Sequence, residues 1–410
     1  MSDTVVSPDF AKIDIETIDP ELAIKLLVHH AARINASDIF LLTCDTYVEV
    51  TLRHWGRMEH IRNIPLDQGK TWISYLKAMA AMDIAERRRP QDGRWLFDDQ
   101  GVLLDLRLNI LPTLYGEDLT IRLLDRNSGL MSVDQIGLSR HDRQEIMAMI
   151  QATSGLILVT GPTGTGKTTT LYACLQYLND GKRKINTLED PIEFSINGLR
   201  QSQVHTKIGI DFPELLRGVM RQQPDVIMVG EIRDHETATT AVRAANSGHL
   251  VFATMHSPIA AGAVQSMLSL GVSAHFLASS LRGVISQRLV RQLDPETRVR
   301  YDLGDATDTF ADIKHLLNDD QGDHFFGPDL TAANDGYIGR AAIFEIMTVN
   351  GELRRAITGR NTAHDLETIA KKHGMLDFRQ SALLKVAQGT TSMEEVFKNV
   401  PTEFLGLDDG

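Results

Sequence analysis

The sequence predicts an α/β protein with two folded parts, a small α+β part followed by a larger part built on a parallel β-sheet. Its 410 residues are 42% hydrophobic, which is enough for two or three domains of about 150 residues each. In residues 20–125, apolar residues at helical spacing are mixed with strand-like alternation. From residue 140 onward, short apolar runs alternate with helical segments, which is typical of a parallel sheet covered by helices on both faces.

The composition excludes several classes of protein. The formal charge is -12, which argues against a protein whose whole surface coats nucleic acid, because phosphate binding needs clustered positive charge. Two cysteines, Cys44 and Cys174, cannot make a disulfide framework, and they fit a reducing compartment. The N-terminal residues lack the basic and apolar regions of a signal peptide, and no run of about 18 apolar residues occurs. We therefore expect a cytoplasmic protein without a transmembrane span.

The N-terminal part should begin after a flexible tail, residues 1–19, which is polar and rich in acids. Residues 20–125 predict an α+β domain whose last third alternates apolar and polar residues as in an antiparallel sheet. In order, the patterns indicate a helix over 21–34, strands over 38–42 and 47–53, a helix over 72–85 and a sheet over 94–124. Residues 126–139 are polar with little periodicity, so they are predicted to be the linker.

The second part should hold the chemistry, because residues 140–290 alternate short strands with helices. The expected elements are a helix over 141–152, a strand over 156–160, a helix over 167–178 and strands over 184–188, 226–229 and 250–254. Residues 291–335 are acidic and irregular. Residues 336–410 predict a C-terminal helical region.

The run GPTGTGKT, Gly161–Thr168, matches the phosphate-binding loop pattern, with Lys167 and Thr168 in register. It follows an apolar strand and opens a helix, so backbone N–H groups and the helix N-terminus point at one anion. Lys167 is expected to reach the β- and γ-phosphates of ATP and Thr168 to supply its hydroxyl to Mg²⁺. The predicted nucleotide-binding residues are Gly161, Pro162, Thr163, Gly164, Thr165, Gly166, Lys167, Thr168 and Thr169.

Acidic residues follow two of the predicted strands. The apolar run 226–229 leads to Glu231, which has the shape of a Walker B element and is expected to meet the magnesium shell. The segment NTLEDPIEF, residues 186–194, carries three acids around a proline that stops the strand. We assign Glu193 as the residue that polarises the attacking water and Asp190 as support for the metal shell. A merely solvated turn is the alternative interpretation.

Two histidines flank the strand in SGHLVFATMH, residues 247–256. They are His249 and His256, and the strand they flank is a third strand of the same sheet, whose carboxyl-end face is where ligands bind in open α/β sheets. One of them is predicted to sense the γ-phosphate or to couple to a neighbouring subunit. A structural role is the alternative for each histidine.

The order of these motifs resembles the family of hexameric ATPases that drive type II secretion and type IV pilus assembly. Besides the phosphate loop, the resemblance rests on QDGR (91–94), LRLNILPTLYGED (106–118), LEDPIEF (188–194), LLRGVMRQQPDVIMVGEIRDHETA (215–238) and SGHLVFATMH (247–256). It covers almost the whole chain after residue 20.

The resemblance implies a RecA-like ATPase core and several roles that spacing alone does not supply. By this likeness Glu193 is the catalytic glutamate, and Arg107 and Arg122 of the N-terminal domain are arginine fingers on the nucleotide. It also implies a homo-hexamer that acts on an inner-membrane platform protein, sits at the inner face of the cytoplasmic membrane only through partners, and binds no nucleic acid.

Two departures from the family pattern bear on the expected cofactors and partners. Many assembly-type members carry two CxxC pairs that hold zinc, whereas residues 291–335 contain no cysteine, so no zinc is expected. The flanking sequences nonetheless resemble the assembly branch rather than the retraction branch. The family often has an additional N-terminal domain, which residues 1–19 are too short to form. The alternatives are a degenerate nucleotide-binding scaffold, a pilus retraction motor and a nucleic-acid translocase.

Overall fold

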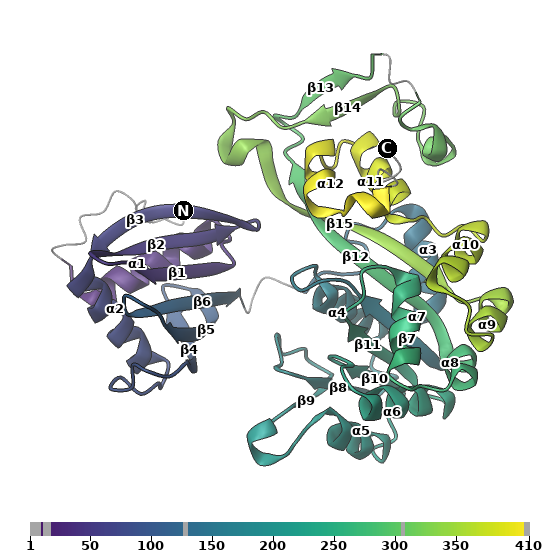
Figure 1. Ribbon diagram of the computed structural model, residues 1–410, viewed down its shortest axis with the longest axis horizontal. Helices are drawn as coiled ribbons and strands as arrows, with labels where there is room; N and C mark the ends of the chain where they lie inside the picture. The colour runs from purple at the N-terminus through teal and green to yellow at the C-terminus, as the bar shows by residue number, and fades with distance from the viewer. Residues whose placement is uncertain (1–9, 11–17, 126–129, 305–307, 406–410) are drawn as a thin grey trace. The chain divides into compact units, whose positions relative to one another are not determined.

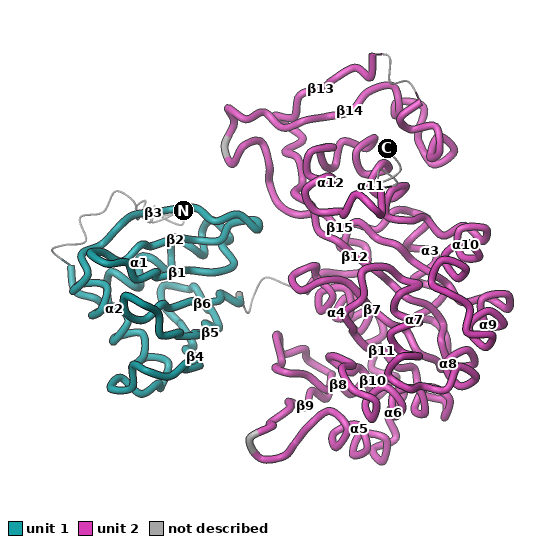
Figure 2. The backbone as a smooth tube through the Cα atoms, viewed as in Figure 1, with its two compact units in different colours: residues 1–129 teal, residues 130–410 magenta. Residues whose placement is uncertain are grey.

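The computed structural model describes residues 10, 18–125, 130–304 and 308–405. The chain divides into two compact units, residues 1–129 and residues 130–410, which Figure 2 shows in different colours. Each unit has its own sheet and its own hydrophobic core.

The N-terminal unit is an antiparallel sheet of six strands in the order β3-β2-β1-β6-β5-β4, with two helices (Figure 1). Its elements are α1 (Pro20–Arg33), β1 (Asp38–Thr43), β2 (Tyr47–His54), β3 (Arg57–Pro65), α2 (Leu66–Met79), β4 (Gln91–Asp99), β5 (Val102–Pro112) and β6 (Glu117–Asp125). Helix α1 begins where expected, because the Asp19 carboxylate caps the Leu22 N–H at 3.0 Å and Pro20 occupies the first turn.

The core of this unit includes a residue from the predicted tail. Phe10 is fully buried, and its ring lies 6.2 Å from that of Trp72 on α2. The prediction of a flexible tail is therefore wrong at Phe10, while residues 1–9 and 11–17 lie outside the described part of the chain. Strand β3 was also not expected. It is an edge strand whose side chains are mostly exposed and polar, so its sequence lacks the apolar alternation that predicts a strand.

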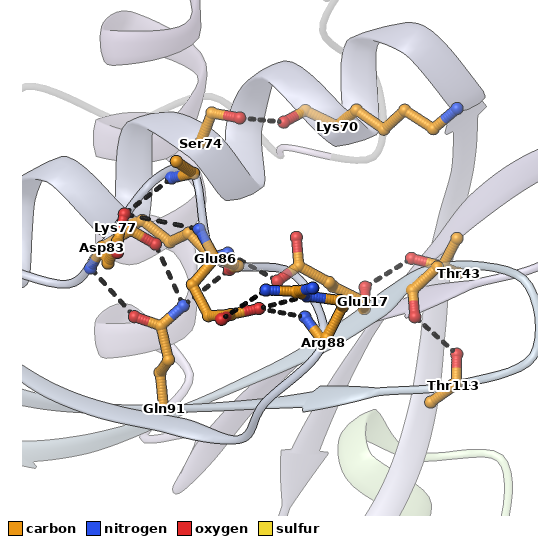
Figure 3. Close-up of polar contacts among 12 residues, drawn as sticks. Thr43, Lys70, Ser74, Lys77, Asp83, Glu86, Arg88, Gln91, Thr113 and Glu117 are labelled. Carbon is orange, nitrogen blue, oxygen red and sulfur yellow. Dashed lines mark hydrogen bonds and ion pairs between the residues drawn. The ribbon is translucent and has the colours of Figure 1, made fainter.

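A buried ion pair joins α2 to the start of β6 (Figure 3). The Lys77 ammonium is 1% exposed and donates to the Glu117 carboxylate at 2.5 Å and to the Glu86 carbonyl oxygen at 2.7 Å. Because a buried ammonium is costly without acceptors, these bonds fix the chain near residue 86 against the sheet. Beside the pair lies a cavity of about 360 Å³, lined in part by Lys70, Ser74 and Tyr115.

The second unit is built on a sheet of seven strands in the order β15-β12-β7-β11-β10-β8-β9. All pairings are parallel except β12 with β15. Its strands are β7 (Gly155–Thr160), β8 (Ile185–Glu189), β9 (Arg200–Gln203), β10 (Val226–Val229), β11 (Leu250–Met255), β12 (Leu281–Leu293) and β15 (Tyr337–Thr348). The parallel part confirms the predicted α/β fold class.

Helices cover both faces of this sheet, which explains why β7, β10 and β11 are buried along their whole length and mostly apolar (Figure 1). Helices α3 (Arg140–Ile150) and α4 (Lys167–Leu178) form the core of one face. The other face is covered by α5 (Phe212–Met220), α6 (His235–Asn246), α7 (Ala260–Ser269) and α8 (Ala274–Ser280). Val133 and Ile136 join the first of these cores, so the second half of the predicted linker packs on this unit. Residues 126–129 lie outside the described ranges.

The C-terminal region differs from the prediction. Residues 337–348 form strand β15, which pairs with β12, so the helical region does not begin at residue 336 but after the strand. The helices are α9 (Gly351–Thr358), α10 (Ala363–Lys372), α11 (Phe378–Ala387) and α12 (Met393–Asn399). Within the acidic segment 291–335, β13 (Val299–Asp302) and β14 (His324–Gly327) form a separate two-stranded sheet. None of the described helices combines the length and apolar character that a bilayer crossing needs.

Candidate nucleotide-binding site

The phosphate loop joins the end of β7 to the start of α4, as the motif requires. Gly161, Gly164 and Gly166 have φ values of +144°, +81° and +85°, which favour glycine. At Gly161 a Cβ would also lie 2.6 Å from the carbonyl oxygen of Gln287 on β12. The loop therefore folds tightly against β12, and only glycine fits where the two backbones meet.

Hydrogen bonds hold the loop in this shape. The Thr165 hydroxyl donates to the Pro162 carbonyl oxygen at 2.9 Å, and the Gln287 amide donates to the Thr165 carbonyl oxygen at 2.6 Å. The Lys167 ammonium donates to the carbonyl oxygens of Gly161 and Pro162, each at 2.8 Å. Burial lowers the pKa of Lys167, and the charges of Glu231 and Arg288 respectively oppose and add to that shift. Pro162, Thr163 and Gly164 are exposed.

Four strands bring the predicted site residues to one edge of the sheet. Strands β7, β11, β10 and β8 are adjacent and parallel, so their carboxyl ends lie together (Figure 1). The phosphate loop follows β7, Asp190 follows β8, Glu231 follows β10 and His256 follows β11. These four groups therefore lie at one edge of the sheet.

Glu231 is the centre of a charged cluster at this edge. Its carboxylate accepts from Arg233 at 2.5 Å and lies 3.1 Å from His256 Nε2. Burial raises the pKa of Glu231, but Arg233, His256 and Lys167 together lower it below its usual value. Asp190 in turn contributes to the raised pKa of Arg233. The two acids assigned to the metal shell therefore share one arginine as their neighbour.

The loop after β8 carries Glu193, three residues beyond Asp190. Glu193 is half-buried, and it lies in a segment that Gln201 and Gln203 of β9 bind through their side chains. Glu189, the first acid of the same segment, is instead the last residue of β8 and is 3% exposed. The alternative interpretation of a solvated turn is therefore wrong for Glu189, which points into the protein.

The two histidines flank β11, so His249 precedes the strand and His256 follows it at the carboxyl-end face. The His249 carbonyl oxygen accepts from Gly155 N at 3.0 Å, at the amino end of β7, and its ring contacts the Ala244 carbonyl oxygen at 2.9 Å. Because β11 lies between them, His249 and His256 are seven residue steps apart, which is about 23 Å at about 3.3 Å per residue. His256 is thus the histidine beside the phosphate loop of its own chain.

The two predicted arginine fingers lie in the N-terminal unit, in a row that crosses five strands. From β4 to β2 the row consists of Arg94, Arg107, Arg122, Asp38 and Arg53. Leu106 and Ile121, next to the fingers in sequence, are fully buried in the core, so the row faces away from it. Asp38 accepts from Arg122 at 3.1 Å, which orients a guanidinium that is 61% exposed.

The second unit offers the donor set that Mg²⁺ prefers, since Thr168, Asp190 and Glu231 all provide oxygen. Among the described residues, no group of three or more histidine, cysteine, aspartate or glutamate side chains could hold a metal by itself. Such a set suits a cation bound mostly through the phosphates of its nucleotide. The absence of zinc remains a prediction.

The fold and this edge define a P-loop nucleotide-binding protein. The chain belongs to the family of type II/IV secretion system proteins, whose pattern matches residues 15–398.

Known proteins agree with this placement. The chain is 40% identical to the type II secretion system protein E of Xanthomonas campestris, over 92% of its own length and 66% of that protein. It is 37% identical to the type IV pilus assembly ATPase PilB of Pseudomonas aeruginosa, over 88% of its length and 64% of that protein. The crystal structure of the pilus retraction motor PilT with bound ADP matches 91% of this chain and 95% of its own, with 25% identity and a TM-score of 0.61.

These similarities confirm the expected family and fold class, and they support an ATPase. The chain spans about two thirds of the length of the two relatives named. The individual roles of the site residues stay predictions. Sequence reasoning missed Arg233 and Gln287 as parts of the site. Arg233 had a signal, because residues two apart in extended chain point the same way, whereas nothing local marks Gln287.

Proposed function

We propose that this chain is the ATP-hydrolysing subunit of a ring of six that powers type II protein secretion or type IV pilus assembly. The observation that carries the proposal is the gathering of Lys167, Glu231 and Asp190 at one edge of the sheet. We place the ring in the cytoplasm, at the inner face of the membrane, where it acts on a platform protein. Nucleic acid and zinc have no part in the proposal.

The phosphate loop binds the nucleotide through its backbone N–H groups and through Lys167, whose ammonium already points at the loop carbonyl oxygens. Mg²⁺, when bound with ATP, neutralises charge on the β- and γ-phosphates. Thr168 and Glu231 hold it, with Asp190 in support. Glu193 orients the attacking water and accepts its proton, which is the task of a general base.

Arg107 and Arg122 complete the site as arginine fingers, because a cation on the γ-phosphate stabilises charge that develops during phosphoryl transfer. Since both lie in the N-terminal unit, any movement of that unit changes their contact with the nucleotide. Hydrolysis is thereby coupled to motion within the ring. His256, which contacts Glu231, is the histidine that reports the nucleotide state.

The test is steady-state Mg-ATP hydrolysis per subunit as the protein concentration rises through the range in which the chain associates. We expect the rate per subunit to climb with association, because fingers from one subunit complete the site of another. A measurable rate that stays flat would mean that each subunit is catalytically complete. No hydrolysis at any concentration would favour the degenerate scaffold, provided that ATP still binds.

A further inference from the structure

A buried carboxylate beside the site has no role in the mechanism above. Glu189 is 3% exposed and accepts hydrogen bonds from three side chains on three different elements. The donors are the Tyr172 hydroxyl, the Thr187 hydroxyl at 2.5 Å and the Gln201 amide at 3.0 Å. These donors satisfy the hydrogen-bonding needs of a buried carboxylate, so they hold the Glu189 side chain in one position.

Gln201 connects the Glu189 carboxylate to the loop that carries Glu193. Its amide nitrogen donates both to Glu189 and to the Phe194 carbonyl oxygen at 2.8 Å. Its amide oxygen accepts from the Ile196 backbone N–H at 2.8 Å. Both donors and the acceptor oxygen of this one side chain therefore bond to Glu189 and to residues that follow Glu193.

Tyr172 approaches the same loop from the helix that begins with the phosphate loop. It lies on α4, five residues after Lys167, and its hydroxyl is hydrogen-bonded to Glu189. Burial and the charge of Glu189 raise the pKa of Tyr172, while backbone hydrogen bonds from Phe194 and Glu193 lower it. The ring also meets that of Phe194 edge-on, with centroids 6.1 Å apart. Tyr172 is thus in contact with Phe194, the residue that follows Glu193.

We propose that Tyr172, Glu189 and Gln201 are positioning residues that fix Glu193 at a set place relative to the phosphate loop. One rigid helix carries both Lys167 and Tyr172, and one carboxylate joins Tyr172 to the loop. A shift of about 1 Å in a catalytic group can cost about a hundredfold in rate, so such a brace acts on turnover rather than on nucleotide affinity. The proposal rests on the role of Glu193 proposed above.

The test compares steady-state hydrolysis and the affinity for a non-hydrolysable ATP analogue in full-length variants. Tyr172→Phe removes one hydroxyl and keeps the ring. We expect kcat to fall about ten- to a hundredfold while KM and analogue affinity stay within about twofold. Tyr177→Phe is the matched control, since Tyr177 lies on the same helix and its hydroxyl accepts from the Gln151 side-chain amide at 3.3 Å. It should behave as the parent protein does.

A double variant separates positioning from general stabilisation. In a Glu193→Gln background there is no base left to position, so adding Tyr172→Phe should cost little further activity. An equal further loss in that background would overturn the proposal. Gln201→Ala provides a second, independent removal and should show the same lack of additivity. Glu189→Gln, which keeps the shape and one acceptor oxygen, should retain more activity than Glu189→Ala.

The outcomes also distinguish this inference from the proposed function. If Glu193→Gln hydrolyses ATP as fast as the parent, the role of Glu193 fails whatever Tyr172 does. If Glu193→Gln is slow but both Tyr172→Phe and Gln201→Ala match the parent, the brace alone is refuted.

Discussion

Glu345 on β15 is a buried acid whose neutralisation should stabilise the second unit in a pH-dependent way. The side chain is 2% exposed, and its Oε1 accepts from the Ala260 N–H at 2.6 Å. Burial raises the pKa of Glu345 to about 7, with Glu367 and Asp377 adding to the rise and the Ala260 N–H and Lys371 opposing it. Glu345→Gln keeps the acceptor oxygen for Ala260 and is neutral at every pH.

The magnitude follows from the difference between the folded and unfolded pKa. The unfolded value is about 4.5, so the folded chain binds more protons than the unfolded chain between about pH 4.5 and 7. The free energy of unfolding therefore falls as pH rises through that interval and levels off above it. At about 1.4 kcal/mol per pKa unit, the buried charge costs about 3 kcal/mol at pH 8 and about 1 kcal/mol at pH 5. The advantage of Glu345→Gln should grow by about 2 kcal/mol between these pH values.

The assay is urea unfolding of the full chain at pH 5, 6, 7 and 8, monitored by far-ultraviolet circular dichroism. All three tryptophans, Trp55, Trp72 and Trp95, lie in the N-terminal unit, so their fluorescence reports that unit as an internal control. Glu214→Gln, at an exposed carboxylate on α5, is the matched variant and should show no such trend. An advantage of Glu345→Gln that is constant from pH 5 to 8 would refute the reasoning.

Three further predictions concern the nucleotide site. Lys167→Ala should weaken ATP binding at least about tenfold, because a hydrogen bond to a charged group is worth about 1.5–3 kcal/mol. Titration with a fluorescent ATP analogue measures this affinity, and Lys182→Ala, at an exposed lysine, is the control. Glu193→Gln should keep ATP affinity and cut turnover at least about a hundredfold in a phosphate-release assay, and equal turnover would remove its assigned role. Arg107→Ala should lower turnover of the assembled protein without weakening ATP binding by single subunits; a matching fall in subunit affinity would contradict the finger assignment.

Strands that are buried on both faces were predictable from the sequence, because burial leaves an apolar run. Strands whose conformation depends on pairing with a segment distant in the chain were not predictable. Strands β7, β10 and β11 are buried throughout and mostly apolar, because helices cover both faces, and their predicted bounds are right within a residue or two. The sequence of strand β15 predicts a helix, because Ala341, Ala342 and Glu345 are residue types with high helix propensity. Its conformation depends on pairing with β12, which lies about fifty residues earlier in the chain.

The site follows the same rule. The motif residues Lys167 and Glu231 were identifiable because their chemistry depends on local spacing after a strand. The sequence alone did not decide between His249 and His256, whereas the strand direction puts them at opposite ends of β11. The burial of Glu189 depends on Tyr172 and Gln201, which approach from separate elements and leave no local trace.

The pairing of Leu293 with Tyr337 at the end of the β12–β15 ladder bears on which insertions the chain can tolerate between these two strands. Residues 294–336 leave the sheet and return to it at that one pair, so they form the loop of a long hairpin. The entropy of closing a loop grows only with the logarithm of its length, by about 0.6 kcal/mol for each doubling. Phe310 and Ile313 of this segment are buried in a core shared with α11 and α12, so they have to be kept. Elsewhere in the segment, insertions such as a reporter domain should be tolerated while the strand that supports the phosphate loop keeps its register.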